Sequence, residues 1–179
     1  VARHLYAHIS LFNVTPDQVT LIGDSAGGNL AAALSLLARQ RGEFMPARQI
    51  LLYPATHYDH SEHSPFPSVR ENGRDYLLTA QKVQDYMELY EPDPQKRRSP
   101  LIAPLLAEDL SGQPKTLIIT AEFDPLRDEG EAYGRRLQAA GVSAEIHRLK
   151  DALHGFISLP PGFLPVKQCY ALINRFLAR

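Results

Sequence analysis

Gly23-Asp24-Ser25-Ala26-Gly27-Gly28 is the stretch of sequence that decides the fold. It follows the apolar run 19–22 and precedes the Ala/Leu-rich segment 28–41, so a predicted buried strand leads into it and a predicted helix leads out. A G-x-S-x-G motif in that setting is typical of a nucleophile elbow, a sharp turn that lifts a serine hydroxyl above a sheet. We expect a side chain at Gly23 or Gly27 to collide with neighbouring backbone, and Asp24 to order the turn by hydrogen bonding.

Four short apolar runs predict strands, one directly before this stretch at residues 19–22 and three after it at 50–53, 116–120 and 144–149. The first three are almost continuously apolar, which favours strands covered on both faces, and the fourth alternates, which favours an edge strand. The predicted helices are 1–12, 28–41, 79–90, 128–140 and 165–177. Strands that alternate with helices indicate an α/β fold with a mostly parallel sheet and right-handed crossovers.

Two later residues complete a candidate site with Ser25. A serine hydroxyl needs a base to take its proton, and His154 follows the last predicted strand. The imidazole in turn needs an acid to fix its tautomer, and Asp124 follows the third strand. The order Ser, Asp, His is the one found on α/β-hydrolase sheets, where sites form at the carboxyl ends of strands. Asp151 is a rival acid, and Asp128 is the more natural cap for the helix after Asp124.

Three motifs carry a resemblance to a known family. Residues 23–30 resemble the elbow of the hormone-sensitive-lipase-like esterases and lipases, residues 124–130 resemble the acid motif of that family, and residues 154–156 its histidine motif. Tyr53-Pro54, Ser99-Pro100 and Ala103-Pro104 also lie where similar proteins have them.

The resemblance implies an α/β-hydrolase fold and a serine carboxylic ester hydrolase. The implied catalytic residues are Ser25, Asp124 and His154, which would act through an acyl-enzyme, and the backbone N–H of Ala26 is the one oxyanion donor that carries over. The implied substrate is a small ester with a short or medium acyl chain. No metal and no organic cofactor is expected.

The chain departs from the family pattern upstream of the elbow. Family members carry a His-Gly-Gly-Gly-type oxyanion loop there, which does not occur in residues 1–179, and several strands before the first helix. We therefore interpret residues 1–179 as the C-terminal part of a single catalytic domain, without the N-terminal strands. Loss of one oxyanion donor costs about 100- to 1,000-fold in rate, so we expect weak or absent turnover by these residues alone. We also expect a homo-oligomer, or association through an exposed strand edge beside 19–22.

Other functions remain open at this point. The same three residues serve amidases, peptidases and acyltransferases on this scaffold. Some relatives are non-catalytic and only bind ligands, although such proteins usually lack a triad residue. Segments 57–72 and 73–90 could shape the wall of a substrate pocket, but nothing in their sequence fixes the length of an acyl chain.

Composition excludes several classes of partner. The net charge is −1 and no Lys/Arg block stands out, so nucleic acid is not expected as a partner. No apolar run approaches the roughly 20 residues that span a bilayer. The single cysteine, Cys169, cannot form an internal disulfide, which favours a cytoplasmic location, and we expect it to be a buried structural thiol.

A histidine-rich segment invites a metal interpretation. Its spacing fits no standard zinc motif, so we interpret it as a solvated loop near the mouth of the substrate site. The residues concerned are His57, Asp59, His60, Glu62 and His63.

Overall fold

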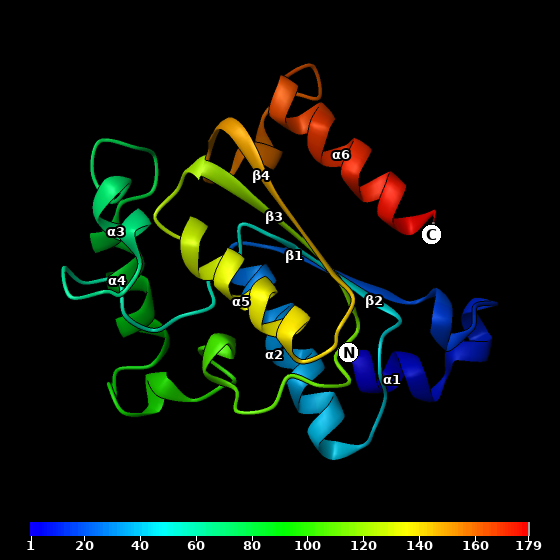
Figure 1. Ribbon diagram of the computed structural model, residues 1–179. Helices are drawn as coiled ribbons and strands as arrows, with labels where there is room; N and C mark the ends of the chain where they lie inside the picture. Colours follow the sequence, from blue (N-terminus) through cyan, green and yellow to red (C-terminus); the bar gives the residue numbers. More distant parts are fainter. Residues whose placement is uncertain (179) are drawn as a thin grey trace.

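The protein is built on a four-stranded parallel sheet, seen in the computed structural model, which describes residues 1–178 (Figure 1). The strands are β1 (Thr20–Asp24), β2 (Arg48–Leu52), β3 (Lys115–Phe123) and β4 (Ala144–Leu153). They lie side by side in chain order, and every neighbouring pair is parallel. All four predicted strands are confirmed, and β4 extends four residues further than its alternating pattern indicated.

Helices cover both faces of this sheet. The helices are α1 (Ala2–Ala7), α2 (Ala26–Arg41), α3 (Pro67–Glu71), α4 (Ala80–Tyr90), α5 (Arg127–Ala139) and α6 (Leu164–Leu177), of which α2, α5 and α6 cover the sheet. Single 3₁₀ turns occur at Ile9–Phe12, Pro16–Gln18, Lys96–Arg98, Pro104–Leu106 and Phe156–Ser158. Figure 1 shows α2 and α5 on one side of the sheet and α6 on the other.

The period-two alternation of the strands divides the core in the same way. Leu51 and Ile118 belong to the cluster that α2 and α5 cover, whereas Ile50 and Leu117 belong to the cluster that α6 covers. Because β2 and β3 bury both faces, their sequences are almost continuously apolar. The expected α/β class, a parallel sheet with flanking helices, is thereby confirmed.

Two expectations for the N-terminal region are wrong. Residues 1–12 do not form one helix, because α1 ends at Ala7 and His8 leaves helical geometry before a 3₁₀ turn. Neither element has a buried residue, so no core contact holds a longer helix together. β1 is not covered on both faces either, since Ile22 is 58% exposed. Within residues 1–178, β1 pairs with β2 alone, and association through its free edge stays a prediction that light scattering measures.

The histidine-rich segment also differs from its expected form. Residues 57–72 contain the short helix α3, and His57 and His60 are buried rather than solvated. The Nε2 atom of His60 lies 2.7 Å from Glu129 Oε2, and Glu129 Oε1 accepts the backbone N–H of His57. Glu129 lies 69 residues further along the chain than His60, so this burial depends on tertiary packing.

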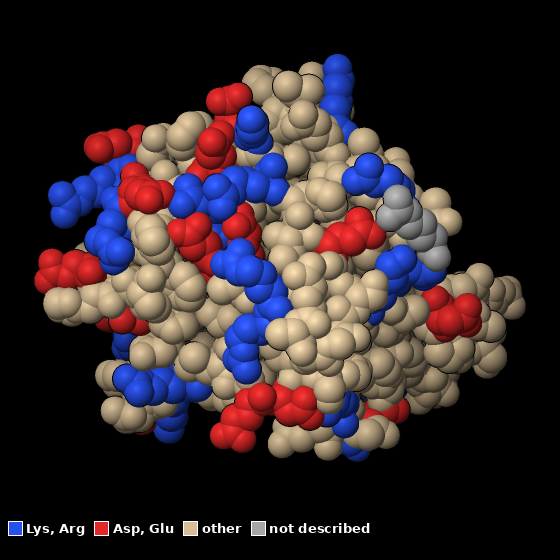
Figure 2. Space-filling view, viewed as in Figure 1, with Lys and Arg blue, Asp and Glu red and all other residues tan. Residues whose placement is uncertain are grey.

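The surface carries no single-sign patch on the face shown in Figure 2, where basic and acidic side chains are interspersed. No helix within residues 1–178 is long and apolar enough to cross a membrane. The expected absence of nucleic-acid partners and the cytoplasmic location stay predictions.

Cys169 is fully buried in α6, as expected, and burial raises the pKa of its thiol to about 11. The raised pKa leaves almost no thiolate at pH 8, and thiolate is the form that alkylating reagents attack. We predict that iodoacetamide at pH 8 leaves the native protein unmodified and adds one group per chain after unfolding in urea, measured by intact mass. Rapid modification of the native protein would contradict this burial.

Candidate active site

Ser25 lies at the turn between β1 and α2, in a backbone conformation that serine rarely adopts. Its φ and ψ are 52° and −118°, and it is the N-cap residue of α2. The backbone N–H of Ser25 donates to Leu52 O over 2.8 Å, and its carbonyl accepts from Asn29 N. Positive φ strains a residue with a Cβ, so the end of β2 and the first turn of α2 together hold the elbow in place.

The glycines of the elbow do not contribute equally. A Cβ added at Gly23 would overlap the carbonyl oxygen of Gly27, and one added at Gly28 would lie 2.9 Å from Pro54 Cβ. A Cβ at Gly27 meets only Asp24 Oδ1, at 3.8 Å. The expected collision is therefore confirmed at Gly23. It is wrong at Gly27, because Gly28 is the residue that lies close to a neighbour.

This difference gives a matched pair of variants. We predict that Gly23→Ala destabilises the fold by about 3 kcal/mol or more, because the overlap is with backbone and the usual cost of overpacking is about 1–3 kcal/mol. Gly27→Ala lies within α2 and meets no close atom, so its free energy of unfolding should stay within about 1 kcal/mol of wild type. Urea unfolding of both variants measures the difference, and equal stabilities would contradict the assigned geometry.

The three predicted side chains meet at the carboxyl ends of β1, β3 and β4. His154 Nε2 lies 2.9 Å from Ser25 Oγ, and His154 Nδ1 lies 2.7 Å from Asp124 Oδ2. Because an ionised carboxylate only accepts, the proton belongs on Nδ1, and Nε2 is then free to accept the Ser25 hydroxyl. Asp124 is fully buried and the His154 side chain is 12% exposed, so the pair is shielded from water.

Asp124 has a second contact that the sequence left open. Its Oδ1 atom accepts the backbone N–H of Leu126 over 2.9 Å, so the same carboxylate also turns the chain into α5. The rival Asp151 is exposed and donates its backbone N–H to Glu122 Oε2. Asp128 lies in the first turn of α5, where its Oδ2 accepts the backbone N–H of Ser68.

Tyr53 is a neighbour of the site whose place sequence reasoning did not assign. Its ring is fully buried and meets the His154 ring edge-on at a centroid distance of 4.8 Å. Its hydroxyl donates to Asp24 Oδ2 over 3.3 Å, which gives Asp24 the ordering contact that we expected. Burial and the adjacent Asp24 raise the pKa of Tyr53, so the phenol keeps the proton that it donates. The Tyr53-Pro54 dipeptide was the available signal.

A cavity of about 380 Å³ opens over Ser25 and His154. Five of its lining residues come from segment 73–90 and none from 57–72, so of the two segments expected to shape a substrate pocket only 73–90 lines this cavity. Ala26, the first residue of α2, also lines the cavity, and amides in the first turn of a helix have no intrahelical acceptor. The remaining lining residues are Asn29, Leu30, Ala55, Leu78, Val83, Tyr86, Met87, Tyr90, Ile102 and Leu126.

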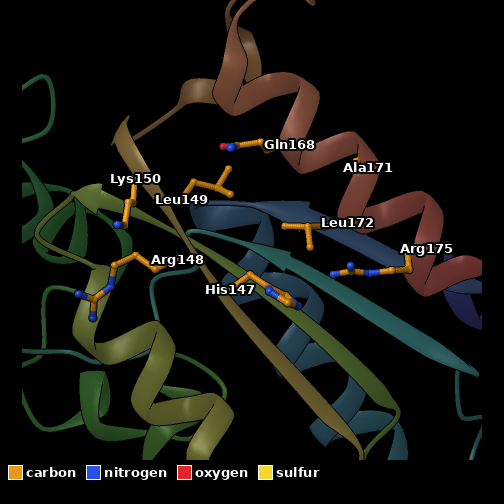
Figure 3. Close-up of a pocket in the computed structure, with 8 residues that line it drawn as sticks. All are labelled: His147, Arg148, Leu149, Lys150, Gln168, Ala171, Leu172 and Arg175. Carbon is orange, nitrogen blue, oxygen red and sulfur yellow. The ribbon is translucent and has the colours of Figure 1, made fainter.

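A second cavity, of about 390 Å³, lies between β4 and α6 (Figure 3). His147 and Leu149 face α6 there, whereas Arg148 points to the other side of the strand and pairs with Glu131 of α5. None of the three triad candidates lines this cavity, so we assign the site to the space over Ser25.

Comparison with known proteins agrees with this geometry. The family described as alpha/beta hydrolase fold matches residues 1–158. The chain belongs to the α/β-hydrolase family. Within that family, the carboxylic ester hydrolase LipN of Mycobacterium tuberculosis is 39% identical over 156 residues, which are 83% of this chain and 40% of LipN. An arylesterase of Saccharolobus solfataricus is 38% identical over 148 residues, 82% of this chain and 47% of that enzyme.

Solved structures give the same result for this α/β-hydrolase. Carboxyl esterase 2 of Tuber melanosporum superimposes with a TM-score of 0.90 at 35% identity, covering 99% of this chain and 60% of that one. The esterase of Pyrobaculum calidifontis gives 0.89 at 36% identity, over 98% and 57% of the two chains. The chain spans about half the length of the curated relatives it matches. The resemblance to hormone-sensitive-lipase-like esterases is confirmed.

Proposed function

We propose that this α/β-hydrolase is a serine carboxylic ester hydrolase whose catalytic residues are Ser25, His154 and Asp124. One observation carries the proposal: His154 lies within hydrogen-bond distance of both partners, 2.9 Å from Ser25 Oγ and 2.7 Å from Asp124 Oδ2. A nucleophile, a base and an orienting acid in this order are the parts that acyl transfer requires. The esterase names of the similar proteins add support.

The reaction follows from the contacts of these side chains. Ser25 Oγ attacks the ester carbonyl carbon while its proton passes to His154 Nε2. The backbone N–H of Ala26, beside Ser25 at the start of α2, stabilises the negative oxygen that forms. The imidazolium then gives its proton to the departing alkoxide, which leaves an acyl group on Ser25. Water, deprotonated by His154, attacks this acyl-enzyme and releases the acid, and the proton returns to Ser25 Oγ.

The lining of the cavity favours a short or medium acyl chain. Four residues of α4 line it: Val83 and Met87 are buried, and Tyr86 and Tyr90 have about 60% of their surfaces exposed. Burial of each ligand methylene contributes about 0.8 kcal/mol to binding, so the cavity volume of about 380 Å³ limits the acyl length that gains affinity.

The chain-length proposal is tested by narrowing the cavity. We predict that Val83→Phe lowers kcat/KM for p-nitrophenyl octanoate by about tenfold relative to p-nitrophenyl acetate, a typical effect of reshaping an apolar pocket. Leu89→Phe is the matched control, because Leu89 is 81% exposed on the same helix and the ratio of the two substrates should not change. If the ratio of kcat/KM for the two esters does not change in Val83→Phe, the cavity does not bind the acyl chain.

The central experiment uses a fluorophosphonate probe on the intact natural protein. We expect one label per chain, located on Ser25 by peptide mass spectrometry. A panel of p-nitrophenyl esters and matched anilides then separates an esterase from an amidase or peptidase, and added alcohols reveal acyl transfer. Absence of labelling at Ser25 would overturn the proposal that the protein is a serine hydrolase. The alternative of a non-catalytic, ligand-binding protein would then remain.

A further inference from the structure

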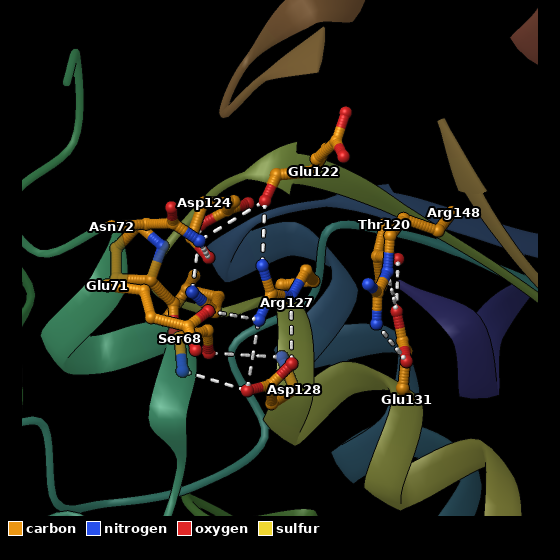
Figure 4. A network of polar contacts seen from close by, with 12 residues as sticks. Ser68, Glu71, Asn72, Thr120, Glu122, Asp124, Arg127, Asp128, Glu131 and Arg148 are labelled. Carbon is orange, nitrogen blue, oxygen red and sulfur yellow. Dashed lines mark hydrogen bonds and ion pairs between the residues drawn. The ribbon is translucent and has the colours of Figure 1, made fainter. Parts of the chain in front are cut away.

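The short helix α3 lies against the backbone that carries Asp124 (Figure 4). Two polar side chains donate to that backbone, from Ser68 of α3 and from Asn72, the C-cap residue that ends α3 and is described with it here. Ser68 Oγ donates to Pro125 O over 2.8 Å. Asn72 Nδ2 donates to Glu122 O over 3.1 Å and to Asp124 O over 3.3 Å. Three of the four carbonyls from residue 122 to residue 125 therefore receive a hydrogen bond from α3.

The contacts to Pro125 O and Asp124 O are buried, and the contact to Glu122 O is partly buried. Ser68 and Asp124 are fully buried and Asn72 is 4% exposed, so water cannot easily replace a lost donor. Loss of the Ser68 hydroxyl removes a donor from the Pro125 carbonyl, and a missing donor at a buried carbonyl is costly. Loss of the Asn72 amide removes one of two donors from Asp124 O and from Glu122 O, which also accept Arg127 N over 3.2 Å and Arg127 Nη1 over 3.1 Å. Ser68 and Asp128 add a reciprocal pair, because Ser68 N donates to Asp128 Oδ2 and Asp128 N donates to Ser68 Oγ. The start of α5 is thereby fixed to α3.

Asp124 itself depends on this support. Its two carboxylate oxygens bond to Leu126 N and to His154, so the direction of the carboxylate follows the course of its own backbone. Arg127 Nη1 also donates to Glu122 O, and its guanidinium pairs with the mostly buried Asp128 and with the more exposed Glu71. Arg127 therefore holds the Glu122 end of the loop, and Ser68 and Asn72 add the buried contacts to the carbonyls of Asp124 and Pro125.

We propose that Ser68 and Asn72 are positioning residues that hold Asp124 at the distance and angle His154 needs. This proposal rests on the proposed function, since it gives α3 a part in the same triad. Displacement of a catalytic group by about 1 Å can cost about 100-fold in rate. Binding of the ester involves the α4 wall and Ser25, not Asp124, so the effect belongs to kcat rather than to KM.

The experiment compares Ser68→Ala, Ser68→Thr and Asn72→Leu in the intact protein. With p-nitrophenyl butyrate we expect kcat to fall about tenfold in Ser68→Ala and about 10- to 100-fold in Asn72→Leu, with KM within twofold of wild type. Ser68→Thr keeps the hydroxyl and should recover most of kcat even if its added methyl lowers the melting temperature. The matched control is Ser35→Ala. Ser35 is a fully buried, hydrogen-bonded serine of α2 that does not contact residues 122–125, so its loss should leave kcat unchanged.

A second measurement is independent of turnover. The low-field proton resonance of the His154–Asp124 hydrogen bond should shift or broaden in Ser68→Ala and Asn72→Leu but not in Ser35→Ala. Thermal melts show which variants are folded at the assay temperature. If Asn72→Leu does not fold, the comparison of Ser68→Ala with Ser68→Thr tests the positioning role.

Folded Ser68→Ala with wild-type kcat and an unshifted resonance would overturn the positioning role. A parallel fall of kcat in Ser35→Ala would also overturn it, because loss of stability would then explain both. An inactive wild type with a shifted resonance in the α3 variants would instead contradict the proposed function and leave the positioning of Asp124 standing.

Discussion

Ser25→Ala is expected to lower kcat for ester hydrolysis by about 10⁴- to 10⁶-fold, the usual range for removal of a serine nucleophile from a triad. The hydroxyl accounts for one side-chain contact, to His154, so its removal should hardly change the fold. The backbone bonds that hold the elbow, from Ser25 N to Leu52 O and from Asn29 N to Ser25 O, remain in the variant.

Initial rates of the intact natural protein with p-nitrophenyl butyrate at high enzyme concentration measure this loss, and a thermal melt of the same samples provides the control. The fluorophosphonate label should disappear together with the activity. A variant that keeps more than about 1% of the wild-type rate with an unchanged melt would show that another residue is the nucleophile.

Asp124→Asn is expected to cost about 10⁴-fold in kcat, because the amide reverses the tautomer of His154. An amide nitrogen cannot accept the Leu126 N–H, so the amide oxygen must keep that contact and the amide nitrogen must face His154 Nδ1. Nδ1 then has to accept, and the ring proton moves to Nε2. A protonated Nε2 opposite Ser25 Oγ can only donate, and it can no longer take the serine proton.

The matched control for this variant is Asp151→Asn. Asp151 was the rival acid in the sequence, and it is exposed with no side-chain bond to His154. We expect its kcat to stay within twofold of wild type. A large loss in Asp151→Asn together with a small loss in Asp124→Asn would reverse the assignment of the acid.

The triad candidates could be predicted from sequence because each follows a strand with a strong apolar pattern. Parallel strands bring their carboxyl ends to one edge of the sheet, so Ser25, Asp124 and His154 had to approach one another once the strand order was known. The distances between them were not predictable. They depend on the bulge in the β3–β4 pairing between Ala121 and Phe123 and on hydrogen bonds to α3, neither of which has a local signal.

The structural details that sequence reasoning missed all depend on distant partners. α3 has five residues, too few for a helical period, and the acceptors of Ser68 and of its C-cap residue Asn72 lie 50 to 57 residues further along the chain. His60 belongs to a polar segment and is nevertheless buried, because Glu129 supplies the partner that its imidazole needs. Gly27 has space around it because Gly28, not Gly27, lies against Pro54.

The course of the chain between β2 and β3 sets limits for engineering by segment exchange. The α4 wall of the cavity lies in this connection, so transplanting it from a relative is a direct way to alter substrate preference. The upstream junction must lie beyond Gly73, since Ser68 and Asn72 serve the Asp124 loop and a Cβ at Gly73 would overlap the Val69 carbonyl. The downstream junction must precede Ile102, whose carbonyl binds Asn29. Residues 74–101 therefore form the segment that can be exchanged. A graft that begins further upstream would replace Ser68 and Asn72 and so remove their hydrogen bonds to residues 122–125.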